Sequence, residues 1–301
     1  MRAKHLFIIL VLGALLLAGC EGEEKKTTES PYEGGTQGII ASFESFGVVE
    51  DGMPTIYGDE TIPIEITLEN KGEQDVEAGD VELKLKGISP EDFSGIEMRK
   101  TNSGELEGIS EFNTLGGEET IDFGDAEYNI DLQTNYYDVT VFASYKYPYK
   151  THVAVPDVCF KEDITDDSVC DIEGPRESFS SGAPIIVKSA KQARAGSGII
   201  AIEYQVENVG GGDVTKPGED FDSRYGQLEF SIDETSNPDE WDCRAAGQEN
   251  EARLVNGKGT IRCKLKNPME EGALYTKQID LTLSYDYRDL IQQSVKIKSK
   301  G

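Results

Sequence analysis

The chain has 301 residues and a formal net charge of −28, from 57 acidic and 29 basic side chains. This charge repels nucleic acid and so argues against DNA or RNA as a partner. It also argues against attachment to anionic lipid headgroups through a basic surface. Apolar residues make up 37% of the chain, enough for folded cores, and the length suffices for two domains.

The chain begins like a secreted precursor. Arg2 and Lys4 precede an apolar run over residues 6–18, which is shorter than the about 20 residues of a membrane-spanning helix. This order predicts a signal peptide over residues 1–19. The run ends in Leu-Ala-Gly-Cys20, which resembles the lipobox of prokaryotic lipoproteins. The resemblance implies that Cys20 carries lipid and anchors an extracytoplasmic protein to the outer face of the cell membrane. An ordinary signal peptide or an uncleaved anchor is the alternative.

The mature chain reads as a tether followed by strands. Residues 20–37 are polar and charged, which predicts a lipidated cysteine and a flexible tether. Apolar and polar residues then alternate over residues 62–69, 81–86 and 139–149. That period of two is typical of strands with one buried face. Since no long amphipathic helix is indicated, the sequence predicts an all-β protein.

An internal repeat predicts the domain organisation. Residues 62–76 (IPIEITLENKGEQDV) align without gaps on residues 200–214 (IAIEYQVENVGGGDV), an offset of 138. A Ser-Tyr-x-Tyr match near the end of each unit, beginning at Ser144 and Ser284, gives an offset of 140. Both matches fit the duplication of a whole domain. We therefore predict two tandem immunoglobulin-like β-sandwich domains, residues 38–173 and 174–301.

The strand followed by Asn-x-Gly resembles CARDB-type and related adhesion-module β-sandwiches of prokaryotic cell surfaces. Together with the lipobox, it makes the chain similar to two-domain surface lipoproteins of archaea. The resemblance implies a binding, adhesion or structural role outside the cell, with a surface protein or glycan as partner and no catalytic residue. A subunit of a cell-surface assembly joined by strand addition is one alternative. A lipoprotein that captures a solute or cation is another, and a hydrolase with an unrecognised site is a third.

The remaining cysteines predict disulfides. Apart from Cys20 the chain has four, Cys159, Cys170, Cys243 and Cys263. An even count outside the cytoplasm predicts two disulfides, for which three connectivities exist. We favour the local pairs Cys159–Cys170 and Cys243–Cys263. No CxxC motif supports a thioredoxin-like site or a zinc knuckle.

No motif supports catalysis. His152 is the only histidine of the mature chain, and it alternates with valines like an outward-facing strand residue. No GxSxG elbow accompanies it. The run Gly210–Gly212 aligns with Gly72–Gln74, which predicts a turn rather than a phosphate-binding loop. We expect no enzyme activity and no cofactor, with calcium as the one possible ligand.

Two acidic clusters are the candidates for that calcium, because hard cations prefer several oxygen ligands. Neither cluster has the spacing of an EF-hand loop, so a solvated acidic loop is the interpretation we favour. The first cluster, in the first unit, is the candidate metal site and consists of Asp163, Asp166, Asp167 and Asp171. The second cluster, in the second unit, consists of Glu219, Asp220 and Asp222.

Three tyrosines are the candidate partner contacts. Tyr145, Tyr147 and Tyr149 alternate along one predicted strand. Aromatic faces stack on sugars and on protein surfaces. Packing inside the sandwich is the alternative, which the recurrence of Ser-Tyr-x-Tyr in the second unit favours.

Overall fold

The computed structural model describes residues 29–58, 60–163 and 168–299. Within these residues the regular structure is β-strand, apart from two short 3₁₀ helices, η1 (Glu234–Ser236) and η2 (Pro238–Glu240). The predicted all-β fold is confirmed. No helix in the described ranges is long and apolar enough to cross a membrane. The predicted signal peptide and Cys20 lie outside the described residues.

The strands form three sheets. A four-stranded sheet has the order β1-β4-β8-β6, and a six-stranded sheet has the order β10-β12-β13-β19-β16-β17. The third sheet has ten strands, with the path β18-β15-β20-β9-β5-β7 and four short strands beside it. The strands of the first sheet are β1 (Ile39–Phe43), β4 (Ile62–Asn70), β6 (Phe93–Ile96) and β8 (Glu118–Tyr128). Those of the second are β10 (Gly174–Arg176), β12 (Ile185–Gly196), β13 (Ile199–Asn208), β16 (Trp241–Ala245), β17 (Gln248–Glu249) and β19 (Lys258–Leu265). Those of the third are β2 (Val48–Glu50), β3 (Met53–Tyr57), β5 (Glu82–Lys86), β7 (Arg99–Thr101), β9 (Tyr136–Lys161), β11 (Phe179–Ser180), β14 (Asp213–Thr215), β15 (Gly226–Ile232), β18 (Glu251–Leu254) and β20 (Leu274–Lys298).

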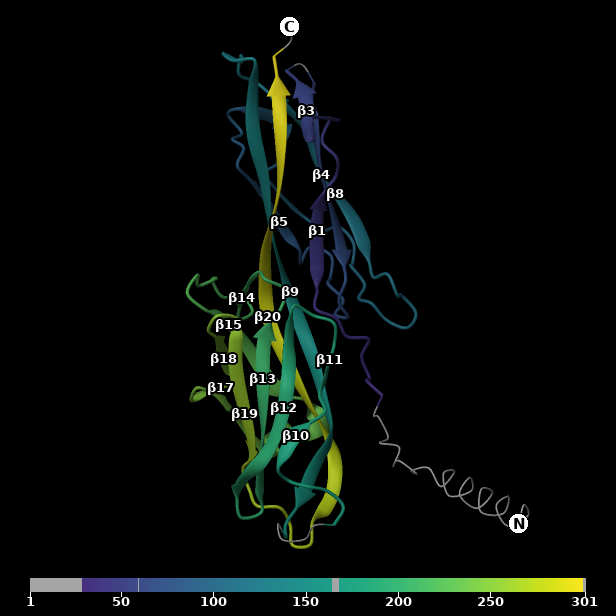
Figure 1. Cartoon of the computed structure of the whole chain (residues 1–301), viewed down its shortest axis with the longest axis vertical. Coiled ribbons are helices and arrows are strands. Elements are labelled where there is room, and N and C mark those ends of the chain that lie inside the picture. The colour runs from purple at the N-terminus through teal and green to yellow at the C-terminus, as the bar shows by residue number, and fades with distance from the viewer. Residues whose placement is uncertain (1–28, 59, 164–167, 300–301) are drawn as a thin grey trace, which may run out of the picture.

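Two strands run the length of the molecule. β9 has 26 residues and β20 has 25, whereas strands in globular proteins usually have about 3–10. They pair antiparallel from end to end, with one register shift near Lys277. Figure 1 shows them side by side along the long axis of the elongated molecule. The ten-stranded sheet is therefore continuous through both halves.

The same face of this sheet is covered by the four-stranded sheet at one end and by the six-stranded sheet at the other. Tyr147 Oη donates to the Ile39 carbonyl of β1 over 3.2 Å. Thr151 Oγ1, further along β9, donates to the Ile185 carbonyl of β12 over 2.6 Å. We call the end that contains β1 the first sandwich and the end that contains β12 the second sandwich.

The expected boundary between residues 173 and 174 does not separate these two sandwiches. The last part of β9 pairs within the second sandwich, where its residues Val153 and Ala154 also pair with β11. The last residues of β20 return to the first sandwich, where Lys296–Lys298 pair with β3. A strand that continues into the neighbouring sandwich within one sheet keeps its backbone groups hydrogen-bonded across the junction.

A tyrosine ties each copy of the repeated Asn-x-Gly turn to the long strands. Asn70 Nδ2 donates to the carbonyl four residues further on, over 2.7 Å, and Tyr149 Oη donates to Asn70 Oδ1 over 3.1 Å. In the second sandwich Asn208 Nδ2 donates to the equivalent carbonyl over 2.8 Å, and Tyr287 Oη donates to Asn208 Oδ1 over 3.4 Å. We call each asparagine–tyrosine arrangement a clamp.

The clamps correct the expected register of the repeat. Tyr287 follows Tyr149 by 138 positions (287 minus 149), as Asn208 follows Asn70 (208 minus 70). The expected match with an offset of 140 is wrong by two residues, a slip that keeps every side chain on the same face of a strand. Pro148 pairs with Asp286, again 138 positions apart. This pair marks the centre of a pseudo-two-fold relation between the sandwiches.

Both disulfides lie in the second sandwich, and they join the two pairs that we expected. Cys159–Cys170 connects the end of β9 to the loop that follows it. Cys243–Cys263 joins residues that face each other on the neighbouring strands β16 and β19. The first sandwich holds no disulfide among its described residues.

The expected tether ends before residue 37. The Gly34 N–H donates to Glu73 Oε1 over 2.6 Å, and the same oxygen accepts the Gly182 N–H over 2.6 Å. The Tyr32 side chain is half-buried, and this burial, together with the charges of Asp280 and Asp233, raises its pKa to about 12. The last residues of the segment are therefore fixed against the body of the protein.

Candidate functional site

The three tyrosines expected to contact a partner are buried. Tyr145, Tyr147 and Tyr149 are 4%, 1% and 2% exposed. The Tyr145 and Tyr147 rings stack, and the rings of Tyr147 and Tyr149 pack edge-on or tilted against each other and against Tyr287 and Tyr285 of β20. Because no partner reaches them in the folded chain, the assignment as partner contacts is wrong. These side chains form the core where the two sandwiches meet.

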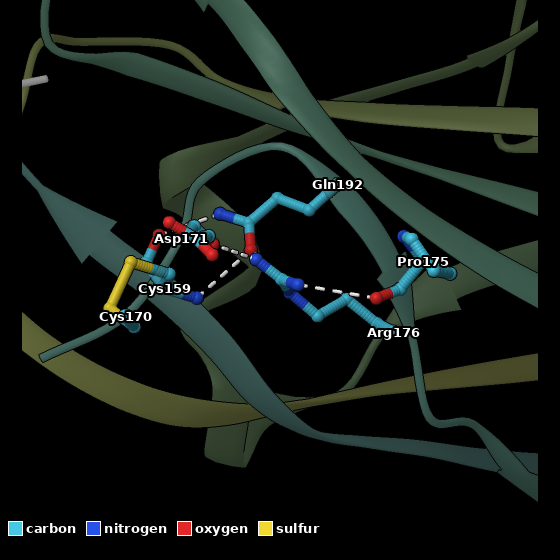
Figure 2. Close-up of a disulfide and its surroundings, with 6 residues drawn as sticks. All are labelled: Cys159, Cys170, Asp171, Pro175, Arg176 and Gln192. Carbon is cyan, nitrogen blue, oxygen red and sulfur yellow. Dashed lines mark hydrogen bonds between the residues drawn. A yellow bond between two sulfur atoms is a disulfide. The ribbon is translucent and has the colours of Figure 1, made fainter. Parts of the chain in front are cut away.

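Of the first acidic cluster, Asp171 follows Cys170 of the Cys159–Cys170 disulfide, whereas Asp166 and Asp167 lie outside the described residues. Figure 2 shows that Gln192 and Arg176 organise this region. Gln192 Oε1 accepts the Cys159 N–H over 2.9 Å and the Arg176 Nε–H over 2.8 Å. Gln192 Nε2 donates to the Cys159 carbonyl over 2.6 Å.

Asp171 has a structural contact through its backbone. Its main-chain carbonyl accepts a hydrogen bond from the Arg176 guanidinium, whose pKa is lowered by burial (Figure 2). Within the described residues, no group of three or more His, Cys, Asp or Glu side chains is arranged to hold a metal ion. Calcium at Asp163, Asp166, Asp167 and Asp171 stays a prediction.

The second acidic cluster does not converge on one point. Asp222 forms an ion pair with Arg224, with 2.6 Å between the carboxylate and the guanidinium. Hydrogen bonds from Arg224 hold the pKa of Asp222 well below its usual value. Asp220 accepts the Thr215 hydroxyl through its main-chain carbonyl over 3.1 Å. Within this cluster, the Asp222 carboxylate is therefore engaged by its own loop.

His152 is half-buried on β9 and has one side-chain neighbour on β20. Its Nδ1 lies 3.1 Å from Thr282 Oγ1, and the Thr282 hydroxyl donates to Asp233 Oδ1 over 2.7 Å. In a nucleophilic triad the imidazole stands between the hydroxyl and the carboxylate. Here the threonine stands between them, so the order of the three side chains differs from that of a triad.

The outer face of the ten-stranded sheet carries a groove that the sequence did not indicate. On β5, the side chains of Leu83 and Leu85 are buried. Because side chains alternate between the two faces of a strand, those of Lys84 and Lys86 point to the outer face. The strand register then places Lys84 opposite Ser144 of β9 and opposite Arg99 of β7. The groove measures about 760 Å³. Its charged lining consists of six cations and one acid, Lys84, Lys86, Arg99, Lys100, Lys146 and Arg288 with Glu82, and we call it the basic groove.

Half of these cations have no acidic partner. Lys146 Nζ lies 3.7 Å from a Glu82 oxygen, and Lys100 and Arg288 are also paired with acids. Lys84, Lys86 and Arg99 form no ion pair with any residue in the described part of the chain, and all three are exposed. In a chain with 57 acids and 29 basic residues, this is a local reversal of sign. Such a face attracts anions despite the net charge of the whole molecule.

The second sandwich has a groove of the opposite charge that includes the equivalent strand pair and extends onto β16 and β17 of the six-stranded sheet. Leu83 pairs with Tyr145 of β9, and Phe230 of β15 pairs with Leu283 of β20. Because Tyr145 and Leu283 are 138 positions apart (283 minus 145), β5 and β15 are equivalent. The groove beside β15 measures about 870 Å³. Five acids and two cations line it, Glu229, Asp239, Asp242, Glu249 and Glu251 with Arg244 and Lys266, and we call it the acidic groove.

The acidic groove is partly neutralised. Arg244 pairs with Asp242 over 2.9 Å and also with Glu249. Lys216 donates to Glu251 over 2.6 Å, and this hydrogen bond raises the pKa of Lys216 above its usual value. Glu229 and Asp239 are exposed. These two carboxylates are the acids of this groove that are available to a partner.

Comparisons with known proteins do not assign the chain to a family. No known protein family matches it, and no curated protein matches it. The chain is 11% identical to the secreted serine protease VesC from Vibrio cholerae, with a TM-score of 0.21; the alignment covers 82% of this chain and spans half the length of the protease. It is 10% identical to the yeast delta-COP-I mu-homology domain, with a TM-score of 0.19 and coverage of 91% and 98%. Likenesses this low support no functional argument.

Proposed function

We propose that this protein is a lipid-anchored, extracytoplasmic binding protein that holds an anionic partner in the basic groove. The observation that carries the proposal is the cluster of unpaired cations Lys84, Lys86 and Arg99 on an otherwise acidic chain. The strands β5 and β7 hold the backbone of these residues in a sheet, so a partner binds without reordering of the main chain, and only the side chains are immobilised.

The proposed role needs no catalytic residue. Thr282 lies between His152 and Asp233 in a chain of hydrogen bonds. This order links β9 and β20 to the residue that follows β15. The basic groove offers cations and hydroxyls, which bind an anion without activating a nucleophile. Strand addition at a sheet edge and capture of a solute, the alternatives expected from the sequence, stay predictions.

The proposed location is supported by the lipobox-like ending at Cys20 and by two disulfides, which suit an oxidising compartment. We expect Cys20→Ser to release the protein into the medium or to leave an uncleaved precursor. Fractionation of cells with an antibody to the mature chain measures this. A Cys20→Ser protein that is processed and membrane-bound like the wild type would contradict the lipid anchor.

Binding of an anion is tested on the mature chain carrying Cys20→Ser. The probe is polygalacturonate, an acidic polysaccharide, with neutral dextran as its control, in calorimetric titration at low salt. We expect binding to polygalacturonate alone and a loss of about tenfold or more when Lys84, Lys86 and Arg99 are changed to Glu, because close charge pairs dominate such contacts.

A matched variant controls for the change in net charge. Lys188, Lys191 and Arg262 are exposed on β12 and β19, strands of the six-stranded sheet. Changing them to Glu alters the total charge equally but leaves the basic groove intact, so we expect polygalacturonate binding to weaken little. An equal loss in both triple variants would show that the net charge, and not the groove, governs binding.

A further inference from the structure

We propose that the anionic partner is a second copy of this chain, whose acidic groove docks on the basic groove of the first. This inference rests on the proposed function, because it names the partner of the same groove. It begins from two observations: each groove includes one of two equivalent strand pairs, β5 with β9 and β15 with β20, and the two grooves carry opposite charge.

The two grooves are similar in size and share one equivalent strand pair, but the acidic groove also reaches β16 and β17 of the six-stranded sheet. Lys146 lines the basic groove, and Ser284, which is 138 positions later (284 minus 146), lines the acidic groove. Both open beside the ten-stranded sheet, and their volumes are about 760 and 870 Å³. Leu290, which is 50% exposed and pairs with Ser144, adds an apolar surface at the margin of the basic groove.

The unpaired charges are complementary. The basic groove offers Lys84, Lys86 and Arg99, and the acidic groove offers Glu229 and Asp239. Contact between two copies brings these sets together, so that each of the two carboxylates gains a cationic neighbour; Lys266, the exposed cation of the acidic groove, is the like charge that this contact must keep at a distance. Within one chain they stay apart, because β5 and β15 belong to opposite sandwiches of an elongated molecule (Figure 1).

Net charge opposes this contact, which gives it a distinctive salt dependence. Two copies of charge −28 repel each other when the Debye length is about 30 Å, at 0.01 M salt. At 0.15 M the Debye length is about 8 Å, so the long-range repulsion is screened while contacts inside the grooves persist. At 1 M it is about 3 Å, and the contacts weaken too. We expect self-association to be strongest at intermediate salt.

The experiment is sedimentation velocity of the soluble mature chain carrying Cys20→Ser, over a range of concentrations and at these three salt concentrations. The basic-groove variant changes Lys84, Lys86 and Arg99 to Glu. The acidic-groove variant changes Glu229 and Asp239 to Lys. We expect the wild type to associate at intermediate salt and each variant alone to associate at least about tenfold more weakly, because each then presents two grooves of like charge.

Mixing the two variants is the decisive measurement. The reversed basic groove of one variant is then acidic, and the reversed acidic groove of the other is basic, so we expect association to return in the mixture. The variant with Lys188, Lys191 and Arg262 changed to Glu serves as the control and is expected to associate like the wild type. Circular dichroism of every variant checks that the β fold is kept.

Three results would overturn the inference. They are a wild type that is monomeric at every salt concentration, association that the groove variants leave unchanged, and a mixture that stays monomeric although each variant is folded. If the wild type is monomeric yet binds polygalacturonate through the basic groove, the second copy is excluded and the proposed function stands. If the wild type neither self-associates nor binds polygalacturonate, both this inference and the proposed function are wrong.

Discussion

The two sandwiches have the same clamp in their interiors and opposite charges in their grooves. Inside, Asn70 with Tyr149 and Asn208 with Tyr287 make the same hydrogen bonds. Outside, Lys84 and Ser231 occupy equivalent strand positions and line grooves of opposite sign. A buried polar group must find its partner, whereas an exposed side chain is exchanged at little cost. The difference therefore separates what the fold requires from what the surface is free to specialise.

The sandwiches also differ in their covalent cross-links. Both disulfides are in the second sandwich. The described part of the first sandwich depends on its buried core and on hydrogen bonds such as those of Asn70, which is 0% exposed. Asn208 is only half-buried. The two equivalent clamps thus carry different shares of the stability of their sandwiches, and substitutions at equivalent positions measure this.

The largest difference is expected between Asn70→Ala and Asn208→Ala. Asn70 Nδ2 donates to two carbonyls, over 2.7 and 2.9 Å, and its Oδ1 accepts the Gly72 N–H and the Tyr149 hydroxyl. Each buried group left unsatisfied costs about 1–3 kcal/mol, so we expect Asn70→Ala to lower the free energy of unfolding by about 4 kcal/mol. Because water replaces the lost bonds at half-exposed Asn208, we expect about 1 kcal/mol there.

Urea unfolding followed by circular dichroism measures both values. Asn70→Asp and Asn208→Asp are the companion variants: each keeps one acceptor oxygen, replaces the amide donor by a second oxygen and adds a negative charge, so we expect the larger loss at Asn70, where the charge is buried. Equal losses in the two alanine variants would show that the clamps contribute equally, and that burial of Asn70 does not set the difference.

The next largest expected effect is the loss of stability when a disulfide is removed, and we expect it in the second sandwich alone. The closed loops have sequence separations of 11 and 20 residues. On the chain-entropy model each bond stabilises the fold by about 3 kcal/mol. We expect the double variant Cys243→Ala with Cys263→Ala to lose about that amount. Amide exchange should then accelerate more in β16 and β19 than in β4 and β8.

The same amide-exchange measurement on the double variant Cys159→Ala with Cys170→Ala tests whether a loss of stability in the second sandwich spreads to the first through the long strands β9 and β20. Cys159 lies in β9, which is part of both sandwiches through its length. Acceleration confined to β12 and the end of β9 is the expected pattern. Uniform acceleration throughout the chain would show that the sandwiches unfold as one cooperative unit.

The sequence predicted local features of the fold well and the junction poorly. Alternation over residues 62–69 indicated β4, and the repeat marked both Asn-x-Gly turns, because these patterns reside in neighbouring residues. Strand structure around His152 was indicated, but its continuity with the Tyr-bearing strand into the second sandwich was not predicted. It depends on pairing with β20, whose residues are more than a hundred positions away, and such non-local pairing leaves no local pattern.

The candidate site shows the same limit. The alternation that contains Lys84 and Lys86 was visible as one strand, but three other strands supply the remaining cations of the basic groove. Only the register between β5, β7, β9 and β20 brings Arg99, Lys146 and Arg288 to it. The tyrosines were conspicuous in sequence because they fill the junction of two cores, a role that hides them from any partner.

The smallest expected effect tests the phenol of the second clamp. Burial raises the pKa of Tyr287 to about 12, and it raises the pKa of Tyr149 above its usual value as well. A tyrosine whose pKa is higher in the folded state stabilises the fold fully below the unfolded pKa of about 10, and this contribution is lost as pH rises from about 10 towards about 12. The wild type should therefore lose stability above pH about 10.

Tyr287→Phe isolates this contribution. At neutral pH we expect it to cost about 1 kcal/mol, because the Gly212 N–H loses the hydroxyl that accepts it over 2.6 Å. As pH rises above about 10, the wild type must keep this phenol protonated against solvent while the variant has no proton to lose. The difference between the two proteins should shrink accordingly in urea unfolding repeated across the alkaline range. Tyr225→Phe, at a half-buried tyrosine outside the clamps, is the control. A difference that stays constant with pH would mean that Tyr287 titrates in the folded protein as it does in the unfolded chain.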